Sequence, residues 1–420
     1  AYSLRSLTGG DPKVVRVRRA SDNGEQDFTA SGVTSGALTS FVNEDVTIYQ
    51  SDFSAGVNGF VQTITTTATG NQDGVSDSAG TSKDNVLKVV KAADSQGYMQ
   101  RDQGVVAGLT YTVSGSFLAP SANTSVDGIM IKDGLAGSSL SDYPSGYLVS
   151  DGTWKDFSFS YTAAVDGNQR VQLGVSSLGS NPNGSSTGST GDIVYIADLK
   201  FVETISNGFV ETWYDQSGNS KDAVQATAGN QPKIVNAGSL VTSSGLASIK
   251  FDGTDDNLTA DSLASVFSGT DKVWSHFSVT EFNNVDNTPI VANLGSSGTN
   301  TPVIYSGISS ARKYRLFVRD DSSTNVLLES GALSLNTPYL NHATTNGAAQ
   351  AQFVNSSAAG TGSTNTGAMT FNRFTLGALG RPSTTSFLNG SISEFIIHNS
   401  NQSANRVALE TNINSHYSIF

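Results

Sequence analysis

The feature that most restricts the fold is an alternation of apolar and polar residues with a period of two. It runs through residues 109–117, 157–161, 171–175 and 193–201, and further strand candidates lie at 249–251, 277–279, 314–318, 374–376 and 392–397. Successive side chains of a β-strand point to opposite faces, so this pattern is typical of strands with one buried face and one wet face. The sequence therefore predicts an all-β chain.

One segment has helical periodicity instead. Leu409, Ile413 and Tyr417 recur every four residues, and Ser403 can cap a helix that begins there. We expect one C-terminal helix over residues 403–417. The segments rich in Gly, Ser, Thr, Asn and Pro are expected to be turns and loops between strands. They are residues 69–84, 119–128, 134–146 and 176–191.

Composition excludes several classes of function. The net charge is −12 with 24 Lys and Arg residues, which argues against nucleic acid as a ligand because phosphate binding needs a basic patch. The chain has no cysteine, so disulfides and thiolate metal sites are excluded. No apolar run approaches the roughly 18 residues of a membrane span. The chain begins at Ala1 rather than Met, and we expect a trimmed start or a piece of a longer protein.

Several segments resemble a known family. They are AYSLRSLTGGDPKVVRVRRASDNGEQDF (1–28), GFVETWYDQSGNSKDAVQ (208–225), QPKIVNAG (231–238) and IKFDGTDDNL (249–258). Together they resemble the catalytic domain of the α-L-arabinofuranosidase B family, a concanavalin A-like β-sandwich. Related domains occur in phage tail and virion-surface proteins. In such proteins the second segment follows the first closely, whereas here a long stretch intervenes.

The intervening stretch has the size of an independent domain. Its opening SDFSAGVNGF (51–60) and its end GDIVYIADLKFVE (191–203) resemble jelly-roll carbohydrate-binding modules. Residues 387–419 resemble the closing strand and helix of laminin-G-like domains. We therefore expect two β-sandwiches: a discontinuous concanavalin A/laminin-G-like host of residues 1–48 and 206–420, and an inserted jelly roll of residues 49–205.

The residues at the family's catalytic positions argue against catalysis. The resemblance implies a Glu nucleophile near 317–322, where this chain has Asp320 and Asp321 and no Glu. It implies an Asp acid in the segment LGALGRP (376–382), where this chain has Arg381. A guanidinium stays protonated and cannot deliver the proton. The family's Cys–Cys pair is absent as well. The four His residues are scattered, so we predict no catalytic residue and no enzymatic activity.

Binding residues are expected in the inserted domain. Tyr143, Tyr147 and Trp154 lie in or beside turn-rich sequence, where aromatic rings could stack on sugars. Trp154 could equally anchor a strand edge. The resemblance also implies a structural calcium that joins the first and last strands, for which Asp52 and Asp198 are the candidates. Two surface carboxylates are the alternative.

Three other clusters favour structural interpretations. The segment DGTDDN (252–257) suggests a calcium loop but lacks a downstream Glu, which favours a β-turn. In the segment 208–225, Phe209, Trp213 and Val224 are expected in the core, while Asp215 caps a turn or pairs with Arg18 or Arg19. The basic and acidic residues near the N-terminus are expected to pair with one another; they are Arg16, Arg18 and Arg19 with Asp22, Glu25 and Asp27.

The preferred function follows from the resemblance and the altered catalytic positions. We expect a non-enzymatic phage virion-surface protein, such as a tail fibre, capsid fibre or decoration protein, located on the virion surface or otherwise extracellular. Its expected partners are host-surface or environmental glycans, other virion proteins and further copies of itself, as a homo-oligomer such as a trimer. The alternatives are a secreted glycoside hydrolase of arabinofuranosidase type and a bacterial surface adhesin.

Overall fold

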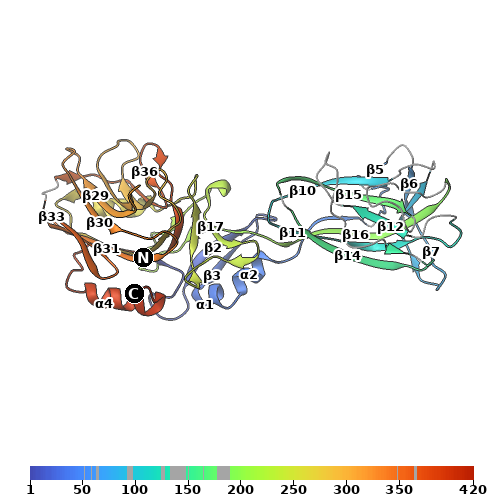
Figure 1. Cartoon of the computed structure of the whole chain (residues 1–420), viewed down its shortest axis with the longest axis horizontal. Helices are drawn as coiled ribbons and strands as arrows, with labels where there is room; N and C mark the ends of the chain where they lie inside the picture. Colours follow the sequence, from blue (N-terminus) through green and yellow to red (C-terminus); the bar gives the residue numbers. More distant parts are fainter. Residues whose placement is uncertain are drawn as a thin grey trace. The chain divides into compact units, whose positions relative to one another are not determined.

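The computed structural model describes residues 1–51, 53–57, 59–62, 66–91, 98–123, 128–132, 148–149, 151–163, 165–176, 190–347, 349–363 and 367–420. The chain divides into two compact units, Ala1–Val42 with Asn207–Phe420, and Asn43–Ser206. Both units are built from antiparallel β-strands, which confirms the all-β prediction (Figure 1). In the described ranges no helix combines the length and apolar character that crossing a membrane requires.

The first unit is a sandwich of two sheets. The front sheet has the order β24 (Leu258–Thr259), β35 (Arg373–Leu376), β27 (Ile290–Gly295), β28 (Val303–Ile308), β29 (Lys313–Arg319) and β30 (Asn325–Ala332). The back sheet has β23 (Ile249–Asp252) and β1 (Tyr2–Ser3) beside β38 (Asn389–His398), followed by β26 (Trp274–Phe282), β31 (Pro338–Asn346), β32 (Ala349–Val354) and β33 (Ser357–Ser363). All five strands predicted for this half lie within these elements.

A further group of strands joins the two sheets. It comprises β2 (Lys13–Arg19), β3 (Glu25–Thr29), β17 (Gly208–Trp213), β18 (Ala223–Val224), β19 (Lys233–Asn236) and β20 (Ser239–Leu240). Strand β17 pairs with β2, β18 and β19; β18 then reaches β24 of the front sheet, and β19 reaches β23 of the back sheet. Three small strand pairs complete the unit. Two are hairpins, β21 (Thr242–Ser243) with β22 (Leu246–Ala247) and β36 (Leu379–Gly380) with β37 (Thr384–Thr385), and the third pairs the sequence-distant strands β25 (Gly269–Thr270) and β34 (Ala368–Met369).

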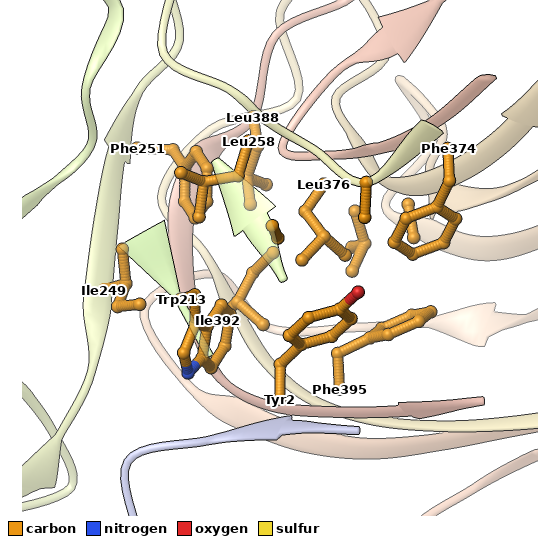
Figure 2. Close-up of a cluster of buried hydrophobic side chains, with 14 of the residues drawn as sticks. Tyr2, Trp213, Ile249, Phe251, Leu258, Phe374, Leu376, Leu388, Ile392 and Phe395 are labelled. Carbon is orange, nitrogen blue, oxygen red and sulfur yellow. The ribbon is translucent and has the colours of Figure 1, made fainter. Parts of the chain in front are cut away.

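The core of the first unit lies between its sheets. Figure 2 shows Tyr2, Trp213, Phe251, Phe374 and Phe395 among the buried side chains, each at most 1% exposed. The ring of Tyr2 stacks on that of Phe374 with centroids 6.3 Å apart. These rings come from β1, β17, β23, β35 and β38, so the core ties both sheets and the joining strands together.

The predicted C-terminal helix is α4 (Arg406–Tyr417), and it begins three residues later than expected. Its residues Ile413 and Tyr417 pack on the outer side of the back sheet, against Phe277 of β26 and other apolar side chains. Ser403 does not cap it, because its backbone N–H and its hydroxyl both donate to Asn401 Oδ1, at 2.8 and 2.5 Å.

Short helical segments lie elsewhere in the first unit and were not expected. They are α1 (Ala30–Thr34), α2 (Ala37–Val42), α3 (Asp261–Ala264), η1 (Ala228–Asn230) and η2 (Ser265–Phe267). They are too short for the four-residue periodicity by which α4 was predicted.

The second unit has its own pair of sheets and its own apolar core. One sheet has the order β13 (Leu148–Val149), β12 (Gly128–Lys132), β15 (Gly167–Ser176), β10 (Tyr98–Val105) and β5 (Val61–Gln62). The other has β14 (Lys155–Thr162), β11 (Thr110–Leu118), β16 (Ile193–Ile205), β9 (Val86–Lys91) and β6 (Thr66–Gln72), and β4 (Val46–Ser51) also pairs with β16. The unit begins at residue 43 rather than 49, because β4 belongs to this sheet.

Two of the four loops predicted for the second unit, 134–146 and 176–191, lie almost wholly outside the described residues. The segment 69–84 is not loop throughout, because it contains the end of β6 and the hairpin of β7 (Val75–Ser76) and β8 (Ser82–Lys83).

Fewer residues of the segment 208–225 are buried in the core than predicted. Trp213 is fully buried, as expected, but Phe209 is half-buried beneath Arg18, whose Cζ lies 4.9 Å from the ring centroid, and Val224 is 39% exposed. The pairing of β17 with β2 shifts register between Val210 and Thr212. This irregularity makes Thr212 and Trp213 both buried, which simple alternation does not anticipate.

Asp215 has the turn-capping role that was one of its two predicted roles. Its carboxylate accepts hydrogen bonds from the backbone N–H groups of Ser217 at 2.9 Å and Lys221 at 3.1 Å. Arg18 donates to Gln231 and Arg19 to Asp22, so neither is its partner. The predicted pairing of the N-terminal charges is confirmed for Arg16 with Asp27 and for Arg19 with Asp22.

Replacing Trp213 by Ala should destabilise the first unit by about 3–5 kcal/mol, because a large buried ring leaves a cavity between the sheets. Val224→Ala should change stability by less than about 0.5 kcal/mol, since its side chain already faces water. Urea denaturation of both variants checks this. Similar losses in both would show that β17 and β18 pack differently from the arrangement described.

Candidate functional site

The aromatic site predicted in the second unit is described only at Trp154. Tyr143 and Tyr147 lie outside the described residues. The Trp154 backbone N–H donates to Asp77 at 2.9 Å, and its indole Nε1 donates to the Val75 carbonyl at 3.2 Å. Trp154 thus ties the β7–β8 hairpin to the start of β14, with the Lys83 ammonium 5.6 Å from its ring centroid. Sugar binding by these three residues stays a prediction.

The predicted calcium pair is likewise described at one residue. Asp52 lies outside the described residues. The Asp198 carboxylate is 68% exposed and forms an ion pair with the Lys83 ammonium at 2.8 Å. Its nearest charge is therefore a cation, as in the alternative of a surface carboxylate, and the calcium site stays a prediction.

The segment DGTDDN brings three carboxylates together in a turn. Oxygens of Asp252, Asp255 and Asp256 lie within 4.8 Å of one another. Asp252 accepts the Thr254 N–H at 2.7 Å, and Asp256 accepts the Asp252 N–H at 2.9 Å. These bonds support the turn interpretation. Burial, together with the neighbouring charge of Asp252, raises the pKa of Asp256 to about 7.

A carboxylate in the segment where the resemblance implies a nucleophile has a structural role. Asp320 is buried at the end of β29, and its two oxygens accept the backbone N–H groups of Thr324 at 2.8 Å and Gly367 at 2.7 Å. Burial alone would raise the pKa of Asp320, but these hydrogen bonds outweigh it and lower the pKa. Asp321 accepts a hydrogen bond from the Thr370 hydroxyl at 3.2 Å.

A cavity of about 550 Å³ in the first unit has charged residues on its wall that are already hydrogen-bonded to other groups. It lies between the N-terminal segment, α1 and the end of α4. Arg5 on its wall donates to Glu394 at 2.7 Å, and Asp11 accepts the Ser31 N–H at 2.8 Å. Because these groups are already engaged, the cavity offers a ligand few polar partners.

The outer face of the front sheet presents a different combination of side chains. In the middle of this face Tyr305 of β28 lies opposite Phe317 of β29, and Phe317 lies opposite Leu327 of β30, which is 46% exposed. The rings of Tyr305 and Phe317 stack with centroids 5.1 Å apart. They rest on a small apolar cluster of Ile290, Val303 and Leu379. We call this outer surface the aromatic face.

Arginines surround the aromatic face. Arg315 and Arg319 alternate with Phe317 along β29, and Arg381 follows β36, whose hairpin contacts β27 and β35. Burial raises the pKa of Tyr305, and the charges of Arg315, Arg381 and Arg319 oppose that rise. Arg315 is paired with Glu329 at 2.7 Å. Figure 1 shows β29, β30 and β36 in this region of the first unit.

Part of the aromatic face can be recognised in the sequence. The alternation of Tyr314, Leu316 and Val318 with Arg315, Phe317 and Arg319 is visible in the chain, but it predicts only a strand. At Arg381 the sequence shows only a residue that cannot replace an acid. What the sequence does not show is the register that sets Tyr305 beside Phe317, or the hairpin that carries Arg381 to them.

Comparison with known proteins finds no matching family model and no matching curated protein. Solved structures match in part. The carbohydrate-binding module CBM40 of a Ruminococcus gnavus sialidase, bound to α2,3-sialyllactose, is 11% identical with a TM-score of 0.34, over 39% of this chain and 95% of that one. A pentraxin from Limulus polyphemus is 14% identical with a TM-score of 0.30, over 38% and 79%.

A third match is the NanB sialidase of Streptococcus pneumoniae, 15% identical with a TM-score of 0.33, over 38% of this chain and 27% of that one. Identities and TM-scores this low leave the ligand to be argued from the side chains of this chain itself.

Asp256→Asn should remove a dependence of stability on pH. The pKa of Asp256 in the folded chain, about 7, lies above the unfolded value of about 3.9. The folded state therefore binds more protons, and the free energy of unfolding falls as pH rises from about 4 to about 7. Asn cannot ionise, so the variant should exceed the wild type by about 1–3 kcal/mol at pH 8. Urea denaturation across pH in EDTA measures this.

Asp255→Asn is the control, since it removes a neighbouring charge but keeps the buried carboxyl. It should retain most of the wild-type slope between pH 4 and 7. If Asp256→Asn and the wild type have parallel profiles, the raised pKa is wrong.

Proposed function

We propose that this chain is a glycan-binding protein without catalytic activity and that the aromatic face binds the glycan. The observation that carries the proposal is the stacked pair of Tyr305 and Phe317 on a sheet surface surrounded by guanidinium groups. Sugar rings present apolar C–H faces that pack on aromatic rings, and their hydroxyls need donors and acceptors at the edge of that platform. The Tyr305 hydroxyl and the arginines offer such groups.

The surroundings of the face favour binding over hydrolysis. A glycosidase needs two carboxyl groups placed across the scissile bond, one of them free to give a proton. Asp320 is engaged by backbone N–H groups, and Glu329 is bound by Arg315 and Lys313. At the position of the family's acid, Arg381 stays protonated. These features support a site that holds a sugar and leaves it intact.

The wider setting of the proposal rests on the resemblance described above. Domains that resemble segments 1–28 and 208–258 occur on phage tails and virion surfaces, where attachment to host or environmental glycans is needed. We propose that setting for this chain, with other virion proteins and further copies of the chain as its neighbours. A bacterial surface adhesin would use the same face in the same way.

Phe317→Leu should weaken glycan binding about ten-fold, or about 1.4 kcal/mol, because it removes the aromatic surface but keeps an apolar side chain on the underlying cluster. Binding of the full chain to a glycan array identifies the ligand, and isothermal titration calorimetry then compares the variants. Trp154→Ala serves as the comparison from the second unit and should leave affinity unchanged. If Trp154→Ala weakens binding and Phe317→Leu does not, the site lies at the aromatic residues of the inserted unit instead.

The chain should release no arabinose from p-nitrophenyl arabinofuranoside above the rate of buffer alone. The reason is that Arg381, at the position where the resemblance implies the acid, cannot deliver a proton. A photometric assay with the purified chain measures this. Turnover that Asp320→Asn or Asp321→Asn abolishes would contradict the proposal and identify a hydrolase.

A further inference from the structure

We infer that the ligand of the aromatic face is an acidic glycan, and that its anionic group is held between Arg319 and Arg381. The inference rests on the proposed function and deepens it. It concerns the charge of the sugar. Carboxylates and sulfate esters share the chemistry required here, since a guanidinium binds both in the same forked geometry.

Arg319 is fixed in place by neutral groups. One of its Nη atoms donates to the carbonyl of Asn300 at 2.6 Å, and its Cζ lies 5.8 Å from the ring centroid of Phe317. Its Nε is buried and has no acceptor among the residues that the structure describes. The side chain is therefore positioned beside the aromatic platform without a carboxylate that neutralises it.

Arg381 is brought to the same face by a fixed hairpin. Asn293 of β27 binds Gly380 through two hydrogen bonds, accepting its N–H at 2.7 Å and donating to its carbonyl at 3.2 Å. The carbonyl of Arg381 accepts a hydrogen bond from Arg373 at 3.0 Å. The Nε of Arg381 is also buried, and within the described ranges it too has no acceptor.

The sheet register places Arg319 in the same row as Gly295, the residue beside which Arg381 lies. Asn293, Tyr305 and Phe317 form one row across the sheet. Because β27 and β29 run in the same direction, Gly295 and Arg319, each two residues further along, lie in the next row of the same face. Strands lie about 4.8 Å apart, so β27 and β29 are about 10 Å apart.

Arg381 covers the Gly295 end of that row. A Cβ at Gly295 would lie 3.6 Å from Arg381 Cγ. The two long side chains can therefore converge on one anionic group above the row.

The two charges repel each other in the absence of an anion. The pKa of Arg381 is lowered, first by burial and then by the charge of Arg319. Five other arginines of the described residues are matched with acids at 2.6–2.8 Å; the pairs are Arg5–Glu394, Arg16–Asp27, Arg19–Asp22, Arg315–Glu329 and Arg406–Glu410. The chain has 36 Asp and Glu residues against 24 Lys and Arg, so acids are plentiful.

The size of the cationic pair indicates a single acidic group rather than a long polyanion. Nucleic acid binding uses many phosphate contacts, commonly six to ten, and the net charge of −12 would repel an extended polyanion. One carboxylate or sulfate on a sugar whose ring packs on Tyr305 and Phe317 satisfies both guanidinium groups. A neutral sugar would leave both uncompensated.

The test compares matched ligands on the full chain. Isothermal titration calorimetry is run with galacturonic acid trisaccharide, its methyl ester, a sulfated galactose trisaccharide and its unsulfated form. We expect each acidic form to bind at least ten-fold more tightly than its neutral partner, and the stronger of the two acids to identify the anionic group.

Arg319→Gln and Arg381→Gln should each remove that ten-fold advantage, so that the acidic and neutral forms of each sugar bind the variant with similar affinity. Arg16→Gln, which removes one paired cation from the same unit, is the matched control and should change affinity by less than two-fold. If a Gln variant fails to fold, Arg381→Lys keeps the charge without the fork and should lose most of the advantage.

The outcomes separate the two proposals. If acidic and neutral forms bind equally and the arginine variants bind as the wild type does, the inference is overturned and glycan binding stands. An oligodeoxynucleotide that competes as well as the acidic sugars also overturns it. If no glycan on the array or in the titrations binds and Phe317→Leu changes nothing, the proposed function itself fails.

Discussion

The pairing of β2 with β17 is the constraint on which the first unit depends. It joins residues on either side of the whole inserted unit, with Val17 opposite Val210. The two chain segments that flank the insert also contact each other next to this pairing. The Ala20 N–H donates to the Asn207 carbonyl at 2.9 Å. A Cβ at Gly208 would lie 2.8 Å from a methyl carbon of Val42. Only glycine fits where β17 begins, so the first unit specifies where the inserted chain must return.

This closure explains how a sandwich tolerates so large an insertion. The entropy lost on closing a loop grows only slowly with its length, and a folded insert with neighbouring ends removes most of even that cost. The insert meets this condition within its own sheet, where β4 near its start pairs with β16 near its end. Each unit also has a separate apolar core. The chain can therefore carry two sandwiches without one core depending on the packing of the other.

The sequence predicts strands well where alternation is regular, and less well where the backbone departs from it. Residues 157–161 alternate strictly between aromatic residues and serine and lie within β14. The register shift in β17 puts two consecutive residues inside, and the two-residue strand β18 leaves Val224 at the surface. The candidate site shows the same limit, because its residues lie on β28, β29 and a hairpin near residue 380. Alternation tells which residues share a face of one strand, but register and hairpin position decide which strands combine.

The repulsion between Arg319 and Arg381 lowers the stability of the free chain and also makes the proposed site selective for charge. Two partly buried guanidinium groups without a carboxylate between them destabilise the fold, since their charges repel and their desolvation is not offset. An internal acid would relieve that repulsion but would also occupy the place of the ligand. The chain instead holds the Arg319 guanidinium with the Asn300 carbonyl and beside the Phe317 ring, which fix this group without neutralising it. An anionic sugar that relieves the repulsion gains energy that a neutral sugar of the same shape cannot, so stability of the free chain and selectivity for charge are opposed at this face.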